Sequence, residues 1–374
     1  MIHTYRPSDY DIFIGIDTDK KSFSFTVKDR NIMKKSKRIP SNPEQMYNYI
    51  RNVYGDKRVI CAYEAGPTGF GLYDYLQGRD LSCVITSPLN IPKPANCMVK
   101  TNRIDSDQIA EHLKSGALKP VRVPEGAWRE LRHLTAIRTN HAQDRKRAKS
   151  RIHALLLLED LYSQLSSEEF KWSNFQIKEL RSIKCSPAVR IRLDDLLDDL
   201  EYARKKLLSA HRSLKAFCDK EPGIKRYLGY LQSIYGIGFV VSVTLLGKIG
   251  DPAYLRNPQE LGAFCGLVPR EHSTGDSINR GSITRLGSET LRFLLIEAAW
   301  VAIRKDVHLQ QFYNRIKSRH HPRIAAKKAI TAVARKLTLI IYRVLKDQRN
   351  YISYHQTQDL KEQPLRICKD SKEQ

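Results

Sequence analysis

Residues 12–116 alternate between strand-like and helix-like segments in an order that few folds share. IFIGI (12–16) is a short apolar run typical of a central strand, and SFSFTVKD (22–29) alternates apolar and polar residues. IMKKSKRIP (32–40) follows after a short turn and predicts a third, antiparallel strand. Further strands are predicted at 58–65 and 81–87, and helices at 43–54, 69–79 and 106–116. The order β-β-β-α-β-α-β-α is that of an RNase H-like α/β domain.

Long helical patterns replace the strands further along the chain. Residues 128–161 predict one helix, and residues 189–217 predict a second, with leucines near i, i+3, i+4, i+7 spacing and a loop containing Trp172 and Pro187 before it. This spacing favours an antiparallel or intersubunit coiled coil, and an intramolecular helical hairpin explains it equally well. We therefore expect four parts: an RNase H-like domain at 1–122, a coiled-coil or helical linker at 123–220, a mostly α-helical domain at 221–348 and a charged tail at 349–374.

The chain is strongly basic, with 64 Lys and Arg against 40 Asp and Glu in 374 residues, a formal charge of +24. Such a surface attracts phosphates and releases their counterions on binding, so we expect nucleic-acid partners. Seven scattered cysteines without a CxxC pair fit buried thiols in a reducing compartment better than a zinc site. Neither a signal peptide nor an apolar run near the ~18 residues of a membrane helix is visible, so we expect a cytoplasmic protein.

Three acids stand where the predicted elements would bring them together. Asp17 follows the strand IFIGI, Glu64 ends the strand VICAYE, and Asp105 lies near the N-cap of the helix predicted at 106–116. Carboxylates that hold Mg²⁺ ions can grip the attacking and leaving oxygens of a phosphoryl transfer. The three acids therefore predict a two-metal site.

A fourth ligand for that site has two candidates. Asn102 lies three residues before Asp105 and offers an oxygen without a charge. Asp107 offers a charge, but the helix dipole alone favours an acid in a first turn, and we prefer this interpretation of Asp107.

Residues 231–246, LQSIYGIGFVVSVTLL, have the pattern of a helix-hairpin-helix. Gly236 and Gly238 would make a tight turn whose amide groups point at phosphate, with a purely structural turn as the alternative. In the first long helix, Arg145 and Arg147 belong to a basic run that either follows a phosphate backbone or forms a solvated face.

Residues 264–295, FCGLVPREHSTGDSINRGSITRLGSETLRFLL, contain a loop rich in hydroxyls, glycine and arginine. A serine nucleophile for phosphoryl transfer must be exposed and close to cations. Ser273 and Thr274 precede Gly275 in this loop. By itself a Ser-Thr-Gly sequence is more often a turn. Four arginines of the segment could bind phosphate in bidentate fashion: Arg270, Arg280, Arg285 and Arg292.

With these motifs the chain resembles the DEDD-type insertion-sequence transposases, including the Piv-like site-specific invertases, a group described as bridge-RNA-guided recombinases. The resemblance spans residues 12–345. It rests on GIDTDKKSF, YEAGPTGFGLYDYL and VKTNRIDSDQIAEHLKSGALKPVRVPE around the three acids, and downstream on IYGIGFVVSVTLLGKIGDPAYLRNPQELGAFCGLVPREHSTG and GSITRLGSETLRFLLIEAAW.

This resemblance implies a RuvC-like domain, a coiled-coil linker and a transposase domain that bears a catalytic serine. Four acids, Asp-Glu-Asp-Asp, would assemble with that serine across the subunits of a homo-oligomer, a dimer or a tetramer. The serine would attack DNA to form a covalent phosphoserine, and donor and target strands would exchange through a Holliday-junction-like intermediate. A structured bridge RNA would pair with both DNAs and supply specificity. The resemblance also implies a bacterial or archaeal protein associated with the nucleoid.

Two positions depart from the family's pattern. The family's KTDxxD appears here as KTNRID, so Asn102 replaces the third acid and the fourth ligand stays open, while the other three acids carry over. In many members the serine directly precedes glycine, whereas here Thr274 does and Ser273 stands one residue earlier. We favour Ser273, because a primary hydroxyl is the less hindered nucleophile, and keep Thr274 as the alternative.

The sequence thus predicts an Mg²⁺-dependent transposase or recombinase of an insertion sequence. One alternative is a Holliday-junction nuclease that uses water, with Ser273 as an ordinary loop residue. Another is a non-catalytic DNA- or RNA-binding protein. The missing acid at Asn102 also leaves open a catalytically decayed copy.

Overall fold

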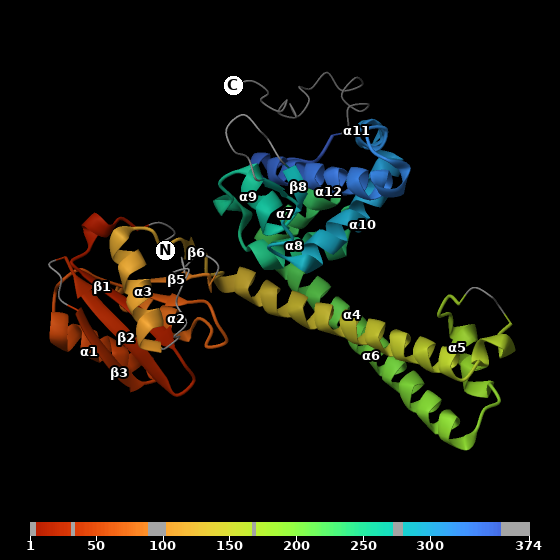
Figure 1. The fold of residues 1–374 in the computed structure, drawn as a ribbon, viewed down its shortest axis with the longest axis horizontal. Coiled ribbons are helices and arrows are strands. Elements are labelled where there is room, and N and C mark those ends of the chain that lie inside the picture. The colour runs from red at the N-terminus through yellow and green to blue at the C-terminus, as the bar shows by residue number, and fades with distance from the viewer. Residues whose placement is uncertain (1–4, 31–33, 89–101, 167–169, 272–279, 353–374) are drawn as a thin grey trace. The chain divides into compact units, whose positions relative to one another are not determined.

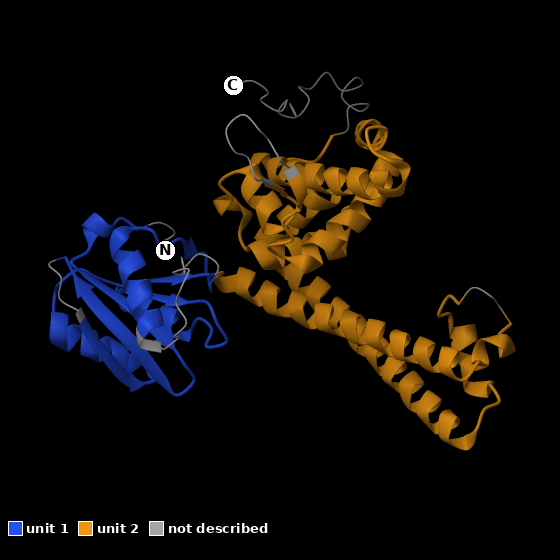
Figure 2. Ribbon diagram, in the orientation of Figure 1, with its two compact units in different colours: residues 1–123 blue, residues 124–374 orange. Residues whose placement is uncertain are grey.

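The computed structural model describes residues 5–30, 34–88, 102–166, 170–271 and 280–352. The chain divides into two compact units, residues 1–123 (unit 1) and residues 124–374 (unit 2) (Figure 2). Each unit has its own hydrophobic core.

Unit 1 is a mixed sheet flanked by helices (Figure 1). In the described residues six strands pair in the order β3-β2-β1-β4-β5-β6. The first three strands are antiparallel to one another, and β1, β4 and β5 are parallel. The elements are β1 (Ile12–Thr18), β2 (Ser22–Asp29), β3 (Lys34–Pro40), α1 (Pro43–Tyr54), β4 (Val59–Glu64), α2 (Gly71–Gln77), β5 (Ser82–Thr86), α3 (Asn102–Ser115) and β6 (Pro120–Val121), after a 3₁₀ turn at Pro7–Asp9.

The predicted β-β-β-α-β-α-β-α order is confirmed, and the sheet fits an RNase H-like domain. The two-residue edge strand β6 was not predicted. The start of the third helix was predicted wrongly: α3 begins at Asn102, so Asp105 lies inside its first turn and not near an N-cap. Asp105 is itself a favoured N-cap residue that precedes the apolar residues of the helix, so the sequence pattern placed the start of α3 one turn too late.

The two faces of β1 belong to different cores, because successive side chains point to opposite faces of a strand. Ile14 and Ile16 pack with α1 and α2, whereas Phe13 packs with Ile109 of α3 on the other face. Gly15 also points toward α3. A Cβ at this position would stand 2.2 Å from the Ser106 carbonyl oxygen. Helix α3 is therefore seated directly on the backbone of β1.

Unit 2 contains a long helical hairpin and a compact helical body (Figure 1). The hairpin consists of α4 (Gly126–Leu158) and α6 (Pro187–Lys220), which lie side by side, joined through a 3₁₀ turn at Leu161–Gln164 and α5 (Asn174–Ser182). Leu155 of α4 and Leu197 of α6 are fully buried in a shared core at the tip. The two helices thus pair within one chain, as the interpretation as an intramolecular helical hairpin predicted. A coiled coil between subunits stays a prediction.

Helix α5 occupies an interval that was predicted to be a loop. Its sequence signal is a capping box, in which the Ser173 hydroxyl accepts from the Gln176 amide and the Gln176 side chain returns to the Ser173 backbone.

The helical body packs around α12, whose Val333, Leu337 and Ile341 are fully buried. It confirms the predicted helical character of this region, while the strand pair β7–β8 was not predicted. Within the described residues, no helix is both long and apolar enough to cross a bilayer. The elements of the body are α7 (Pro222–Gln232), α8 (Phe239–Ile249), a 3₁₀ turn (Pro252–Tyr254), α9 (Pro258–Phe264), β7 (Pro269–Glu271), β8 (Arg280–Ile283), α10 (Glu289–Lys305), α11 (Val307–Lys317) and α12 (Pro322–Asp347).

Candidate active site

Asp17 and Glu64 lie side by side at the ends of two parallel strands. The register of β1 and β4 pairs Ile16 with Tyr63, so the next residue on each strand carries one of the two acids. Asp17 is two residues beyond Gly15, and Glu64 is two beyond Ala62, which belongs to the core under α3. Both carboxylates therefore point to the face that α3 covers, and both are half-buried.

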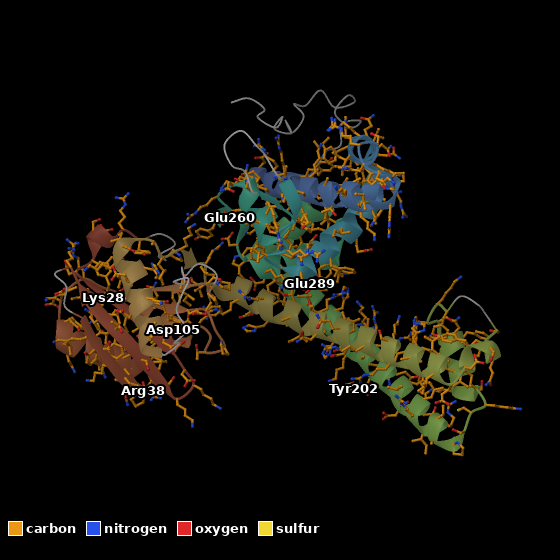
Figure 3. The ribbon with its side chains drawn as sticks, in the orientation of Figure 1. Lys28, Arg38, Asp105, Tyr202, Glu260 and Glu289 are labelled. Carbon is orange, nitrogen blue, oxygen red and sulfur yellow. The ribbon has the colours of Figure 1, made fainter. Side chains whose placement is uncertain are left out.

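Asp105 is brought to the same edge by the packing of α3 on β1. The neighbouring Ser106 is buried; its carbonyl lies against Gly15, and its hydroxyl is 2.9 Å from the hydroxyl of Thr26 on β2. These contacts fix the first turn of α3 over the carboxyl end of β1. Asp105 lies in that turn and is half-buried (Figure 3).

The three acids share an edge of the sheet without forming a closed set of ligands. Among the described residues, no three Asp, Glu, His or Cys side chains stand close enough to hold one metal ion together. Mg²⁺ commonly binds through one or two carboxylates, with water and substrate phosphates as its other ligands. The neighbouring carboxylates of Asp17 and Glu64 fit that requirement in both donor type and position.

Asp107 is held away from these acids by Lys28. The Lys28 ammonium lies 2.9 Å from Asp107 and 2.6 Å from Glu111. Burial opposes the charged form of Lys28, but the hydrogen bonds to Glu111 and Asp107 outweigh it and raise the pKa of Lys28. Residues two apart on a helix do not face the same way, so Asp107 points away from Asp105. This geometry favours a structural role for Asp107.

The other candidate for the fourth ligand, Asn102, opens α3. It stands three residues before Asp105 and so lies on the same side of the helix. The side chain of Asn102 is outside the described part of the structure.

Ser273 and Thr274 also lie outside the described residues, but the strands that carry them are described. Glu271 of β7 pairs with Arg280 of β8, so both hydroxyl residues belong to the connection 272–279 of a β-hairpin. Sequence reasoning placed them in a loop and did not foresee its paired base.

Two glycines allow the backbone at the base of this hairpin to contact neighbouring backbone closely. A Cβ at Gly287, where φ is +112°, would stand 2.4 Å from the Phe264 carbonyl oxygen, and a Cβ at Gly266 would stand 2.5 Å from the Leu286 oxygen. The Ser288 amide donates to the Phe264 oxygen at 2.8 Å. Only glycine permits this contact of two backbones, so the hairpin base has little freedom to shift.

The four arginines around the hairpin differ in exposure and in hydrogen bonding. The half-buried Arg292 donates to the backbone oxygens of Cys265 at 3.4 Å and of Arg285 at 3.3 Å, and so supports the hairpin base. Arg270 and Arg285 are exposed, and Arg285 holds a φ of +56°, a conformation that costs a non-glycine residue energy. The side chain of Arg280 is outside the described part of the chain.

The two glycines of the α7–α8 turn also differ in role. Gly236, at φ +84°, is pressed against α10, where a Cβ would stand 2.2 Å from the Ala298 oxygen. Gly238 is exposed and is the N-cap residue of α8, where it has no side chain to cap the helix. Gly236 therefore serves packing, and only Gly238 lies at amides that could meet a phosphate. On α4, Arg145 and Arg147 are both exposed, and Arg147 pairs with Asp144 at 3.3 Å.

Sequence reasoning missed the residues that position the acids, above all Gly15 and Lys28. A glycine inside a strand pattern often marks a close backbone approach, and GID before the first acid carries that signal. Nothing in the sequence near Lys28 indicates its carboxylate partners, which lie on α3.

Known protein families match both units. A model described as "Transposase", of the DEDD type, matches residues 14–159, and the model of the transposase IS116/IS110/IS902 family matches residues 228–314. Together they match more than half of the chain. The first matched range includes all three acids, and the second includes both hydroxyl residues of the hairpin connection.

Individual relatives agree with these families. The protein y4qE of Sinorhizobium fredii, whose name assigns it to the transposases, is 29% identical over 65% of this chain and 58% of its own length. The transposase for insertion sequence element IS1111A of Coxiella burnetii is 24% identical over 90% of both chains. The pilin gene-inverting protein of Moraxella bovis is 31% identical over 35% of this chain and 40% of its own. With both family models in place, the chain belongs to the IS116/IS110/IS902 family of transposases, which are DNA-recombining enzymes.

Proposed function

We propose that the chain exchanges strands between donor and target DNA, with Asp17, Glu64 and Asp105 as carboxylate ligands of Mg²⁺. The observation that carries this proposal is the placement of Asp17 beside Glu64 at the ends of parallel strands, under the first turn of α3. Bound there, Mg²⁺ would supply positive charge against the phosphate under attack. The chain's own contribution is to hold the acids on one edge, through the close packing of α3 on Gly15.

Ser273 is the proposed nucleophile, with Thr274 as the alternative. Its hydroxyl oxygen would bond to the phosphorus of the scissile phosphate and give up its proton to solvent, while the bond to the leaving strand breaks and that strand's oxygen takes up a proton. The result is a phosphoserine, which a second strand would resolve by the reverse attack. Arg270, Arg280 and Arg285 would bind phosphate around the loop, and Arg292 would hold its base in place.

The remaining partners follow from the same proposal. A structured bridge RNA would pair with donor and target DNA and select the sites, and the acids of one subunit would meet the serine of another in a dimer or tetramer. The α7–α8 turn would act as a helix-hairpin-helix, with the α8 amides at Gly238 approaching a phosphate. Arg145 and Arg147 would contribute to nucleic-acid binding along α4.

The test is a search for a covalent adduct. The protein would be incubated with Mg²⁺, RNA from the flanks of its element and a junction-bearing DNA, and any DNA-linked peptide would be mapped by mass spectrometry. We expect an adduct on Ser273 that disappears in Asp17→Asn. Asp19→Asn is the matched control, because Asp19 is exposed in the turn after β1, where its carboxylate accepts from the Lys20 amide.

Each other outcome points elsewhere. An adduct on Thr274 would move the nucleophile by one residue. Cut DNA without an adduct would replace the serine mechanism by a metal nuclease that uses water. DNA binding that survives with neither cutting nor adduct would leave a non-catalytic binding protein or a decayed copy.

A further inference from the structure

One face of the α4–α6 hairpin carries two rows of basic side chains. Arg138, Arg145 and Lys149 follow one another on α4 at i, i+7 and i+11, which places them on one side of the helix. On α6, Arg204, His211 and Lys215 repeat the same spacing. We call these six residues the basic face.

The two rows meet across the hairpin. Arg145 is close enough to Arg204 of the facing helix to lower its pKa, after burial. At the other end, burial and then the charges of Arg138 and Lys215 lower the pKa of His211. Cationic side chains from both helices are thus gathered into one surface, and His211 among them is held toward its neutral form.

Much of this charge is held away from water. Arg138, Lys149 and Arg204 are half-buried, and the buried Nε of Arg138 has no hydrogen-bond partner among the residues that the structure describes. A buried donor without a partner has lost its hydrogen bond to water and gained none in return, and repulsion between neighbouring cations adds to that cost. An anion bound to the basic face would relieve both costs.

The acids of the two helices relieve little of this repulsion: Glu201 raises the pKa of Arg204, but by less than burial and Arg145 together lower it. Within the described parts of the chain, no carboxylate forms an ion pair with any residue of the basic face. The carboxylates pair elsewhere: Asp144 with Arg147, Asp199 with Arg151, and Glu201 with Arg181. A surface that only contacts solvent has no need to keep its unpaired cations apart from its ion pairs, whereas this hairpin does so.

Two members of the basic face are also held in position. The Arg204 guanidinium donates to the Trp172 backbone oxygen at 2.6 Å, and the Lys149 ammonium lies 5.1 Å from the centre of the Trp172 ring. Trp172 itself adopts a φ of +59°, which is rare for a bulky residue. These contacts reduce the freedom of the two cations before any ligand arrives, so less entropy is lost on binding.

The ligand that fits is a linear polyanion. Positions 138 to 149 span ~17 Å of helix at ~1.5 Å per residue, the rise of about five base pairs. We propose that the basic face binds the sugar-phosphate backbone of a double-stranded nucleic acid, as a site distinct from the β7–β8 hairpin and its arginines. The proposal rests on the proposed function only in taking nucleic acid as the polyanion, and either a DNA or an RNA duplex offers that chemistry.

The test measures the salt dependence of binding by the full-length protein. DNA and RNA duplexes of one sequence, about 25 base pairs long, would be titrated without Mg²⁺ by fluorescence anisotropy over a range of salt concentrations. The slope of log K against log salt is negative, and each lost phosphate contact reduces its magnitude by about 0.9 for B-DNA. The same loss weakens binding about fivefold near 0.15 M salt. We expect this change in Arg145→Gln, and a larger one in Arg145→Gln with Lys149→Gln.

Arg151→Gln is the matched control, because it removes the same charge from the same helix where Asp199 already pairs with it. Stability separates binding from a structural role: Arg145 is exposed and repelled by its neighbours, so its removal should leave the melting temperature of the free protein unchanged or raise it. A fall in melting temperature, or an equal slope change in Arg151→Gln, would overturn the proposal.

The two duplexes identify the ligand. A slope change confined to the DNA duplex assigns the face to donor or target DNA, and one confined to the RNA duplex assigns it to a structured RNA. An unchanged slope with both duplexes refutes a phosphate-backbone site. Because binding is measured without Mg²⁺, absence of a covalent adduct would refute strand exchange and leave this result standing.

Discussion

Replacement of Gly15 by alanine tests whether close packing positions the acids. The new Cβ would stand 2.2 Å from the Ser106 oxygen and 2.3 Å from the Ala110 nitrogen, whereas ordinary contacts begin at 3.4 Å. Both atoms belong to the backbone, so no side-chain rotation relieves the overlap and α3 must move away by about 1 Å or more. Overpacking of this kind costs about 3 kcal/mol. In unit 1, of 123 residues, that corresponds to a fall of about 12 °C in melting temperature.

Hydrogen exchange provides the assay, because it reports on α3 alone. A loss of about 3 kcal/mol should speed exchange of the α3 amides roughly a hundredfold. All three tryptophans, Trp128, Trp172 and Trp300, lie in unit 2, so their fluorescence serves as an internal reference that should not change. Gly71→Ala is the matched control, since a Cβ there meets nothing within 4 Å and alanine favours the helix that Gly71 opens.

The same substitution should affect catalysis beyond its effect on stability. A displacement of about 1 Å at Asp105 can cost about a hundredfold in rate, measured below the melting temperature of the variant. Unchanged α3 exchange in Gly15→Ala together with unchanged adduct formation would refute the idea that this contact sets the position of Asp105.

Two further substitutions probe unit 2. Gly287→Ala places a Cβ 2.4 Å from the Phe264 oxygen at a positive φ, so we expect the hairpin base to open at a cost above ~2 kcal/mol, seen as faster exchange of its amides and loss of the adduct. Burial first, and then nearby cations, lowers the pKa of His153 and of His211 from 6.5. The unfolded chain therefore binds protons more readily than the folded chain does. The free energy of unfolding of unit 2 should be largest at about pH 7.5 and should fall as the pH drops through about 6.5. Calorimetry of a double His→Gln variant should show this dependence reduced; an unchanged profile would contradict it.

The sheet of unit 1 could be predicted because its signals are local. Alternating or continuous apolar runs mark β1, β2 and β4, and the order of the elements restricts the topology. The same order placed Asp17 and Glu64 at neighbouring strand ends. What the pattern could not supply is the seating of α3, because that depends on the absence of a side chain at Gly15 and on backbone atoms almost a hundred residues away.

Unit 2 shows where such signals fail. The strands β7 and β8 have three and four residues, too few for a period to be visible, and their pairing depends on glycines whose partners are distant in sequence. The basic run of α4 could be predicted, but pairing separates its members: Arg147 pairs with Asp144, while Arg145 lies near Arg204 of α6. Charge counts along one helix cannot distinguish these cases, because the distinction arises from the facing helix.

Close backbone packing occurs within each unit: Gly15 seats α3 beside the acids, and Gly266 and Gly287 hold the base of the β7–β8 hairpin. A substitution among the acids should therefore leave the hairpin base intact, and the reverse also holds. This independence allows a test of whether the acids and the serine of one site come from different subunits. If acids and serine meet across subunits, a mixture of Asp17→Asn and Ser273→Ala chains contains mixed dimers with one complete site. Random pairing would then restore adduct to about a quarter of the native level.

The position of that adduct is the decisive readout. It should lie only on the Asp17→Asn chain, which keeps its serine but borrows acids from its partner, and a mass tag on one chain identifies it. If each chain completes its own site, the mixture is as inactive as either variant alone, because neither chain holds both the acids and the serine. An adduct on the Ser273→Ala chain would instead show that Thr274 can act as the nucleophile, since that chain keeps its acids and has lost only the serine.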